Sequence, residues 1–287
     1  MDLSIIEAFQ SIRNPLLDWF FYISTNLGDQ YAFIIVAVIL YWTYDKKYAH
    51  KFALTFMISA MVNSGLKEIF KRPRPYTEDG IEPPFGYETT GYSFPSGHAQ
   101  ASGVLGYTAY DLYKKHKMNW LKWVGLFIII VVPLSRVYLA QHYLSDVLVG
   151  VMLSVLISIG MFKLIDKMND KEEIYTLFIL PVLVILMIFV KNHDLYIAAG
   201  GFMGFAVGYF VEKRYIGYNV KNTNLNQVLK VIIGVIIALV IKEGFKLIFP
   251  EVLFFDFLRY LLIGGWAACG APYMFKYVFK KNIQKEI

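Results

Sequence analysis

Long apolar runs separated by short polar segments constrain the fold of this 287-residue chain more than any other feature. The runs recur at roughly the 20-residue length that crosses the hydrocarbon core of a bilayer as a helix. Hydrophobic residues make up 57% of the sequence. Backbone polar groups inside a bilayer must be satisfied within the protein, which favours helices. The sequence therefore predicts an all-α fold, a polytopic transmembrane helical bundle.

Nine segments are predicted as spans, at 30–44, 53–70, 98–112, 121–139, 144–164, 174–190, 195–210, 228–249 and 254–273. The first 29 residues mix charged and apolar positions and break at Asn14 and Pro15, which predicts amphipathic helices at the membrane interface. They lack the features of a cleaved signal peptide. We therefore expect interfacial helices at 1–29, a core at 30–168 and a C-terminal transmembrane extension at 169–287.

The distribution of basic residues predicts the orientation in the membrane. Of the 28 Lys and Arg residues, 18 lie in the segments 44–51, 111–122, 163–173, 212–230 and 276–287. By the positive-inside rule these segments are cytoplasmic, so the N-terminus is expected outside and the C-terminus inside. The formal charge of +6 is explained by this pattern, and no nucleic-acid partner is expected. A single cysteine, Cys269, excludes an intrachain disulfide.

Three polar segments fall on the predicted outer face: 67–75 (KEIFKRPRP), 92–98 (YSFPSGH) and 135–146 (SRVYLAQHYLSD). Ionisable groups at membrane depth are costly, so they indicate a functional site. Together the segments supply cations, two imidazoles, a hydroxyl, a carboxylate and a turn that opens a helix, a set suited to binding phosphate. If a helix begins near His142, Asp146 lies on the same face and can fix the imidazole tautomer.

Each residue also has an ordinary structural interpretation when taken alone. Lys67 fits an interfacial lysine whose amine reaches the headgroups, and His98 fits a satisfied histidine at a helix start. Asp146 fits an acid stabilised at a helix N-terminus, and Pro-Ser-Gly is an ordinary turn. The occurrence of all three segments on one predicted face argues against these separate interpretations.

The spacing of the polar residues follows three motifs, Lys-x6-Arg-Pro, Pro-Ser-Gly-His and Ser-Arg-x5-His-x3-Asp. They read Lys67 to Arg74-Pro75, Pro95-Ser96-Gly97-His98, and Ser135-Arg136 through His142 to Asp146. The sequence therefore resembles the type 2 phosphatidic acid phosphatase superfamily over about residues 55–165, with no departure from its motifs. The nine-span layout also looks like the glucose-6-phosphatase and sphingosine-phosphate phosphatase branches.

The resemblance implies a role for each motif residue. His142 would attack phosphorus to form a phosphohistidine, Asp146 would hold its other ring nitrogen, and His98 would protonate the leaving oxygen and then activate water. The phosphate oxygens would be bound by Lys67, Arg74, Ser96, Gly97 and Arg136. Such a cage of cations stabilises charge directly, so neither a metal nor another cofactor is expected.

We accordingly expect a membrane phosphatase, with its catalytic core at 30–168, acting on a lipid phosphate or lipid diphosphate at the outer leaflet. Acidic and aromatic residues in the loop 76–93 favour such a substrate over a soluble anion. Hydrolysis of a soluble phosphoester such as a sugar phosphate is the alternative. A transporter is disfavoured because inverted repeats are not evident, and a silent scaffold is disfavoured because every motif residue is present.

Two features lie outside the core segments. Gly200, Gly204 and Gly208 form a stripe that allows close helix contact, within one chain or in a homodimer, and the first is favoured by about two to one. The protein is thus expected as a monomer or homodimer. A second group of residues is expected to form internal ion pairs rather than to touch substrate: Lys242, Glu243, Lys246 and Arg259.

Overall fold

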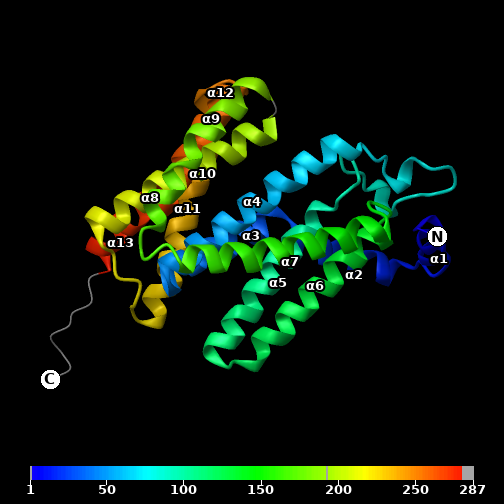
Figure 1. Ribbon diagram of the computed structural model, residues 1–287, viewed down its shortest axis with the longest axis horizontal. Helices are drawn as coiled ribbons and strands as arrows, with labels where there is room; N and C mark the ends of the chain where they lie inside the picture. Colours follow the sequence, from blue (N-terminus) through cyan, green and yellow to red (C-terminus); the bar gives the residue numbers. More distant parts are fainter. Residues whose placement is uncertain (1, 192, 280–287) are drawn as a thin grey trace. The chain divides into compact units, whose positions relative to one another are not determined.

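The computed structural model describes residues 2–191 and 193–279, and every regular element in these ranges is a helix (Figure 1). This confirms the predicted all-α fold. The α-helices are α1 (Asp2–Ser11), α2 (Pro15–Thr25), α3 (Gln30–Ile39), α4 (Lys46–Phe70), α5 (Gly97–His116), α6 (Asn119–Tyr138), α7 (Leu144–Asp166), α8 (Glu172–Leu177), α9 (Ile179–Phe189), α10 (His193–Val211), α11 (Asn224–Ile248), α12 (Leu253–Gly265) and α13 (Ala271–Val278). Short 3-10 or π turns are η1 (Asn26–Gly28), η2 (Leu40–Tyr44), η3 (Pro75–Thr77), η4 (Pro84–Gly86), η5 (Glu212–Ile216) and η6 (Trp266–Gly270).

The chain forms two compact units. Of the described residues, the first unit contains 2–36 and 51–163, and the second contains 37–50, 164–191 and 193–279. The three-part division expected from the sequence stays a prediction. The predicted basic segment 276–287 lies largely outside the described residues.

Among the residues that the structure describes, five helical segments are long and apolar enough to cross a membrane: Asn119–Tyr138, Leu144–Asp166, Glu172–Phe189, Leu195–Ile216 and Leu253–Val278. A sixth results if Pro15–Gly28 and Gln30–Tyr44, bent by 52°, form one span. The expected count of nine is therefore not confirmed. The other predicted spans, at 53–70, 98–112 and 228–249, do form helices. In α4 and α5 polar residues such as Asn63 and Gln100 lower the apolar character.

A buried core in the first unit fixes the helix ends that carry the polar motifs. Ile6 of α1, Ala99 of α5, Val137 of α6 and Val147 of α7 are almost fully buried in one cluster. Helices α5 and α6 lie side by side (Figure 1). Because this cluster buries residues near the start of α5, the end of α6 and the start of α7, it brings three separate chain segments to one place.

In the second unit α10 packs closely against α12. A Cβ atom at Gly200 would lie 2.3 Å from the Phe257 carbonyl oxygen, and one at Gly204 would lie 2.0 Å from that of Leu261. Contact this close leaves no room for a side chain, so the glycine stripe packs within the chain, as favoured from the sequence.

The charged residues near the end of α11 and in α12 form the ion pairs expected from the sequence. Lys242 pairs with Glu243 at 3.3 Å, and Lys246 pairs with Glu251 at 3.1 Å. Arg259 and Asp256, both buried in α12, form a third pair.

Candidate active site

The hydrogen bonds of the His142 ring determine which nitrogen carries its proton. His142 is 2% exposed and lies between α6 and α7. Its Nε2 is 3.1 Å from Arg74 Nη1. Arginine only donates hydrogen bonds, so Nε2 is the acceptor and a neutral ring carries its proton on Nδ1. Nδ1 faces Ser93 Oγ at 3.3 Å and Asp146 Oδ2 at 3.6 Å.

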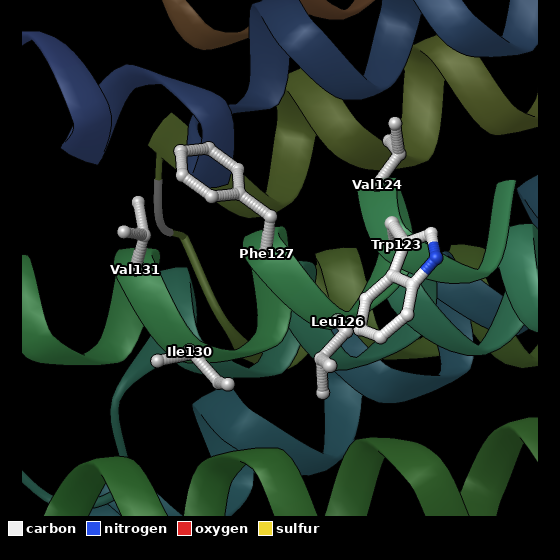
Figure 2. Close-up of a pocket in the computed structure, with 6 residues that line it drawn as sticks. All are labelled: Trp123, Val124, Leu126, Phe127, Ile130 and Val131. Atoms are coloured by element: carbon white, nitrogen blue, oxygen red, sulfur yellow. The ribbon is translucent and has the colours of Figure 1, made fainter. Parts of the chain in front are cut away.

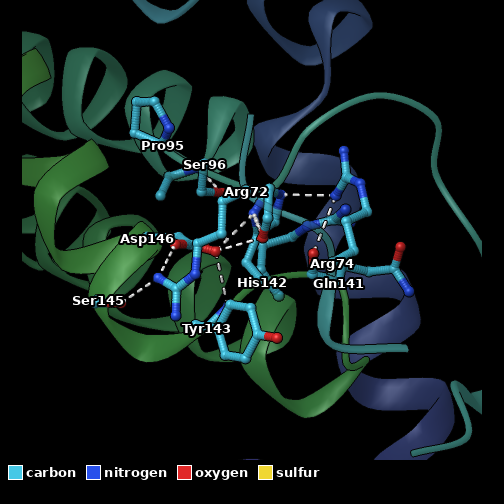
Figure 3. A network of polar contacts seen from close by, with 12 residues as sticks. Arg72, Arg74, Pro95, Ser96, Gln141, His142, Tyr143, Ser145 and Asp146 are labelled. Carbon is cyan, nitrogen blue, oxygen red and sulfur yellow. Dashed lines mark hydrogen bonds and ion pairs between the residues drawn. The ribbon is translucent and has the colours of Figure 1, made fainter. Parts of the chain in front are cut away.

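Asp146, in the first turn of α7, is completely buried and has several partners (Figure 3). Its Oδ2 accepts hydrogen bonds from the Ser93 hydroxyl and, at 3.0 Å, from the Tyr143 backbone N–H. Arg72 donates to Oδ1 at 2.7 Å. The sequence suggested that His142 and Asp146 share a helix face if a helix begins near His142. They do not, because α7 begins at Leu144. The turn before α7 brings them together instead, with Ser93 between them.

Arg74 is held by backbone carbonyls. Its Nε donates to Gly91 at 2.8 Å, Nη2 to Thr90 at 2.8 Å, and Nη1 to Gln141 at 3.0 Å. These three bonds tie the segment after α4 to the loop before α5 and to the loop before α7. The guanidinium is therefore fixed beside the His142 ring (Figure 3).

Two further cations predicted from the sequence lie in the same unit. Arg136, 1% exposed near the end of α6, donates from Nη1 to Thr25 Oγ1 at 2.9 Å and to Tyr87 Oη at 3.2 Å. Its Nε is buried and has no hydrogen-bond partner among the described residues. Lys67, in the last turn of α4, donates to the Tyr92 carbonyl.

The Pro-Ser-Gly-His segment opens α5. Ser96 is the N-cap, and its hydroxyl accepts a hydrogen bond from the Ala99 N–H at 3.3 Å, which explains the helix start. Asn63 of α4 donates to the Pro95 carbonyl at 3.0 Å. His98 follows Gly97 in the first turn, and the charges of Arg74, Arg136 and Lys67 all act on its ring. The structure thus brings the three motifs together.

Burial and neighbouring cations determine the protonation of the loop groups. Burial, followed by the charges of Arg136, Arg74 and Lys67, lowers the pKa of His142 well below its usual value. Burial, followed by the charge of Arg136, lowers the pKa of Arg74 to about 10. At neutral pH the ring is therefore neutral, its unprotonated Nε2 accepts the hydrogen bond from Arg74, and the guanidinium keeps its charge.

Sequence reasoning missed several residues that support the site. Ser93 lies two residues before Pro95, the first residue of the Pro-Ser-Gly-His motif. Arg72 lies inside the first motif at a position that the motif leaves unspecified. Their sequence positions were the only signal. Asn63, Tyr87 and Asp2 gave none, because their contacts depend on chain segments that are distant in sequence.

An apolar groove of about 510 Å³ runs along α6 (Figure 2). It is lined by Trp123, Val124, Leu126, Phe127, Ile130 and Val131. None of the predicted site residues lines it. Helix α6 thus carries an apolar groove on one part of its length and the buried Arg136 near its C-terminal end.

The fold and the site define a multi-pass helical membrane protein with a buried histidine site rich in cations. Residues 48–170 match the family described as the PAP2 superfamily, and residues 196–282 match the PAP2 superfamily phosphatase, transmembrane extension. The chain belongs to the PAP2 superfamily, which confirms the resemblance found in the sequence.

The similar proteins include phosphatases that are named for lipid phosphates. Sphingosine-1-phosphate phosphatase 1 of Rattus norvegicus is 27% identical over 168 residues, which are 57% of this chain and 39% of that protein. Phosphatidylglycerophosphatase B of Bacillus subtilis is 33% identical over 59% of this chain and 84% of its own length. The crystal structure of a transmembrane PAP2-type phosphatidylglycerolphosphate phosphatase from Bacillus subtilis superposes with a TM-score of 0.50 at 29% identity, covering 59% of this chain and 86% of that one.

Proposed function

We propose that this protein hydrolyses a lipid phosphate or lipid diphosphate through a phosphohistidine on His142. The observation that carries the proposal is the ring itself. It is buried, its pKa is lowered, and its Nε2 lone pair points to a fixed arginine while Nδ1 faces Ser93 and Asp146. This is the arrangement of an activated nucleophile with an orienting carboxylate.

The charge around the ring supports an anionic substrate. Three cations act on the ring, Lys67, Arg74 and Arg136, and they outnumber the buried carboxylate of Asp146 beside it. The buried Nε of Arg136 has no hydrogen-bond partner among the described residues, and a phosphate oxygen would satisfy it. Phosphoryl transfer depends mainly on positioning and on stabilising charge, which fixed guanidinium groups supply.

The proposed reaction has two steps. His142 Nε2 attacks phosphorus, Arg74 transfers its hydrogen bond from Nε2 to a phosphoryl oxygen, and His98 protonates the leaving oxygen. The positive charge that develops on the ring is stabilised by Asp146, both directly and through the Ser93 hydroxyl. In the second step His98 removes a proton from water, which attacks the phosphohistidine and releases inorganic phosphate. Ser96 and the Gly97 N–H bind phosphoryl oxygens at the start of α5.

The proposed substrate is anchored in the outer leaflet. Several similar proteins are named for lipid phosphates or diphosphates, including an undecaprenyl-diphosphatase of Sulfolobus acidocaldarius that is 28% identical over 137 residues. In this chain the apolar groove on α6 gives a hydrocarbon tail a surface on the same helix as Arg136. The proposed orientation, with the N-terminus outside and the C-terminus cytoplasmic, gives the site access to the outer leaflet.

Phosphate release from purified protein in detergent tests the proposal. The panel contains phosphatidic acid, phosphatidylglycerol phosphate, a polyprenyl diphosphate, sphingosine phosphate and a sugar phosphate. We expect kcat/KM to be highest for a lipid substrate, and His142→Ala to abolish turnover with all of them. His98→Ala should be partly spared with a good leaving group, because such a group needs less acid assistance.

Two outcomes would contradict the proposal. Turnover by His142→Ala at the wild-type rate would exclude the phosphohistidine. Equal kcat/KM for the sugar phosphate and the best lipid would exclude the lipid preference and favour hydrolysis of a soluble phosphoester.

A further inference from the structure

Arg72 connects the N-terminal helix to the buried carboxylate of the site. Its Nη1 donates to Asp146 Oδ1 and to Ser145 Oγ, both at 2.7 Å (Figure 3). Its Nη2 donates to Asp2 Oδ2 at 3.1 Å. We propose that Arg72 is a positioning residue for the phosphatase reaction, which orients Asp146 toward His142, and that Asp2 of α1 supports it. The inference rests on the proposed function and adds a residue that the motifs do not contain.

The two oxygens of Asp146 have different partners. Oδ1 faces Arg72, whereas Oδ2 accepts from Ser93 and from the Tyr143 N–H and is the oxygen nearer to His142. A carboxylate in the first turn of α7 could rotate about its side-chain torsions, which the bond to Oδ1 opposes. Arg72 thereby keeps Oδ2 on the side of Ser93 and the His142 ring.

Charge gives Arg72 a second effect on Asp146. The carboxylate is 0% exposed, and a buried carboxylate stays ionised only if a cation or hydrogen bonds compensate for the lost water. Arg72 is the only cation with a hydrogen bond to it among the described residues. Lys67, Arg74 and His142 act on it without such a bond, and the nearby Glu78 is bonded instead to the Tyr143 hydroxyl.

Two further contacts, with Tyr143 and with Asp2, fix the Arg72 guanidinium. Its guanidinium lies 3.8 Å from the centre of the Tyr143 ring. Asp2 accepts hydrogen bonds from Arg72 and, at 2.5 Å, from the Ser145 hydroxyl. The carboxylate of Asp2 therefore faces the same guanidinium that binds Asp146. Through this contact the N-terminal helix acts on the orientation of the buried acid.

The first experiment compares Arg72→Met and Arg72→Lys with wild type, using the best lipid phosphate of the panel. Arg72→Met should lower kcat on the order of 10²-fold with little change in KM, because Arg72 acts on the reacting ring through Asp146 and not on the substrate. The acid limb of its pH profile should move to higher pH, because loss of a cation from the site favours the protonated form of the His142 ring. Arg72→Lys keeps the charge and should restore the position of the acid limb while kcat recovers in part.

The second experiment is a double-mutant cycle with Asp2→Asn. Alone, this substitution should lower kcat about threefold, as expected for a partly exposed ion pair. In the Arg72→Met background it should have no further effect, because Asp2 acts through Arg72. Arg13→Met is the matched control. Arg13 is similarly half-buried and also ties the N-terminal segment to the loop before α5, through the Glu82 carbonyl at 2.7 Å, but has no bond to Asp146.

Specific results would overturn the inference. One is a folded Arg72→Met protein with the kcat and the acid limb of wild type. Another is that the effects of Arg72→Met and Asp2→Asn on kcat add in the double mutant. A third is that Arg13→Met shifts the acid limb as much as Arg72→Met does. If Arg72→Met does not fold, the cycle is run with Arg72→Lys and Asp2→Asn, and a wild-type kcat in folded Arg72→Lys or additive effects of these two substitutions would overturn the inference. Failure of the proposed function looks different, because wild type would then release no phosphate or His142→Ala would remain active.

Discussion

At the scale of single residues, the proposed reaction depends on the lone pair of His142 Nε2. Arg74 approaches this nitrogen as a hydrogen-bond donor at 3.1 Å, and the same cation helps to keep the ring neutral. The carboxylate of Asp146 lies on the opposite side of the ring, with the Ser93 hydroxyl between. In the proposed reaction the ring is therefore neutral before attack and is stabilised as a cation afterwards.

The pH dependence of wild type follows from this neutral ring. Burial and the charges of Arg136, Arg74 and Lys67 lower the pKa of His142. A lowered pKa keeps the nucleophile deprotonated to more acidic pH, so kcat/KM should hold through about pH 6.5, the ordinary value for histidine, and fall below it. The measurement is kcat/KM against pH in detergent. An acid limb centred above that value would contradict the prediction.

Ser93→Ala tests the hydroxyl between His142 and Asp146. It removes one hydrogen bond to a buried carboxylate, which is worth about 1.5–3 kcal/mol, so kcat should fall roughly 10- to 100-fold. Thr77→Ala is a suitable control, because the Thr77 hydroxyl bonds only locally to the Arg74 carbonyl at 2.6 Å. Equal rates for Ser93→Ala and wild type would show that Asp146 acts on the ring without Ser93.

At the scale of helices and loops, the site depends on where helices begin and end. Ser96 starts α5, Asp146 lies in the first turn of α7, and Arg136 lies in the last turn of α6. A helix start supplies unpaired N–H groups, and an acid in its first turn is stabilised by the helix dipole. The same local rules that stop and start these helices therefore place the polar groups at their ends.

Packing between α10 and α12 can be tested with two neighbouring glycines. Gly204→Ala places a Cβ atom 2.0 Å from a backbone oxygen of α12, whereas Gly201→Ala meets nothing within 4 Å. We expect Gly204→Ala to lower stability by about 1–3 kcal/mol. Gly201→Ala should be neutral or slightly stabilising, because alanine favours helix. Thermal unfolding in detergent measures both, and equal midpoints would contradict the close packing.

At the scale of the whole molecule, membrane orientation decides which leaflet supplies the substrate. We expect Asp79→Cys, in the exposed loop before α5, to react with an impermeant maleimide on intact cells. Lys115→Cys, at the other end of α5, should react only after permeabilisation. Both are made in a Cys269→Ser background, because Cys269 is the only cysteine of the sequence. The reverse labelling pattern would invert the proposed orientation.

Charge stabilisation by cations alone can also be tested on the whole protein. Among the described residues no group of three His, Cys, Asp or Glu side chains is placed to hold a metal ion. We expect activity to persist in EDTA, and vanadate to inhibit as a five-coordinate mimic of the transition state. Activity that is lost in EDTA and returns with magnesium would contradict a site built from cations.

The sequence by itself determined the helical class, the family and the residues of the three motifs. Apolar length predicts membrane helices, and the motif spacings are local enough to be read along the chain. The sequence did not determine the number of spans. Helices α4 and α5 carry polar residues that serve packing and the site, and these residues make the two helices less apolar than lipid-facing helices. Glycine spacing predicted a close contact of α10, although only the structure identified α12 as its neighbour.

Only the tertiary structure decided how the motif residues are supported. Ser93 lies between His142 and Asp146, and Arg72 joins Asp146 to Asp2, because α1, α5 and α7 meet at one buried cluster. Such contacts join residues as many as 143 positions apart, as between Ser145 and Asp2. No periodicity or spacing encodes them. They result from packing, which fixes side chains from distant segments against one another once the apolar surfaces are buried.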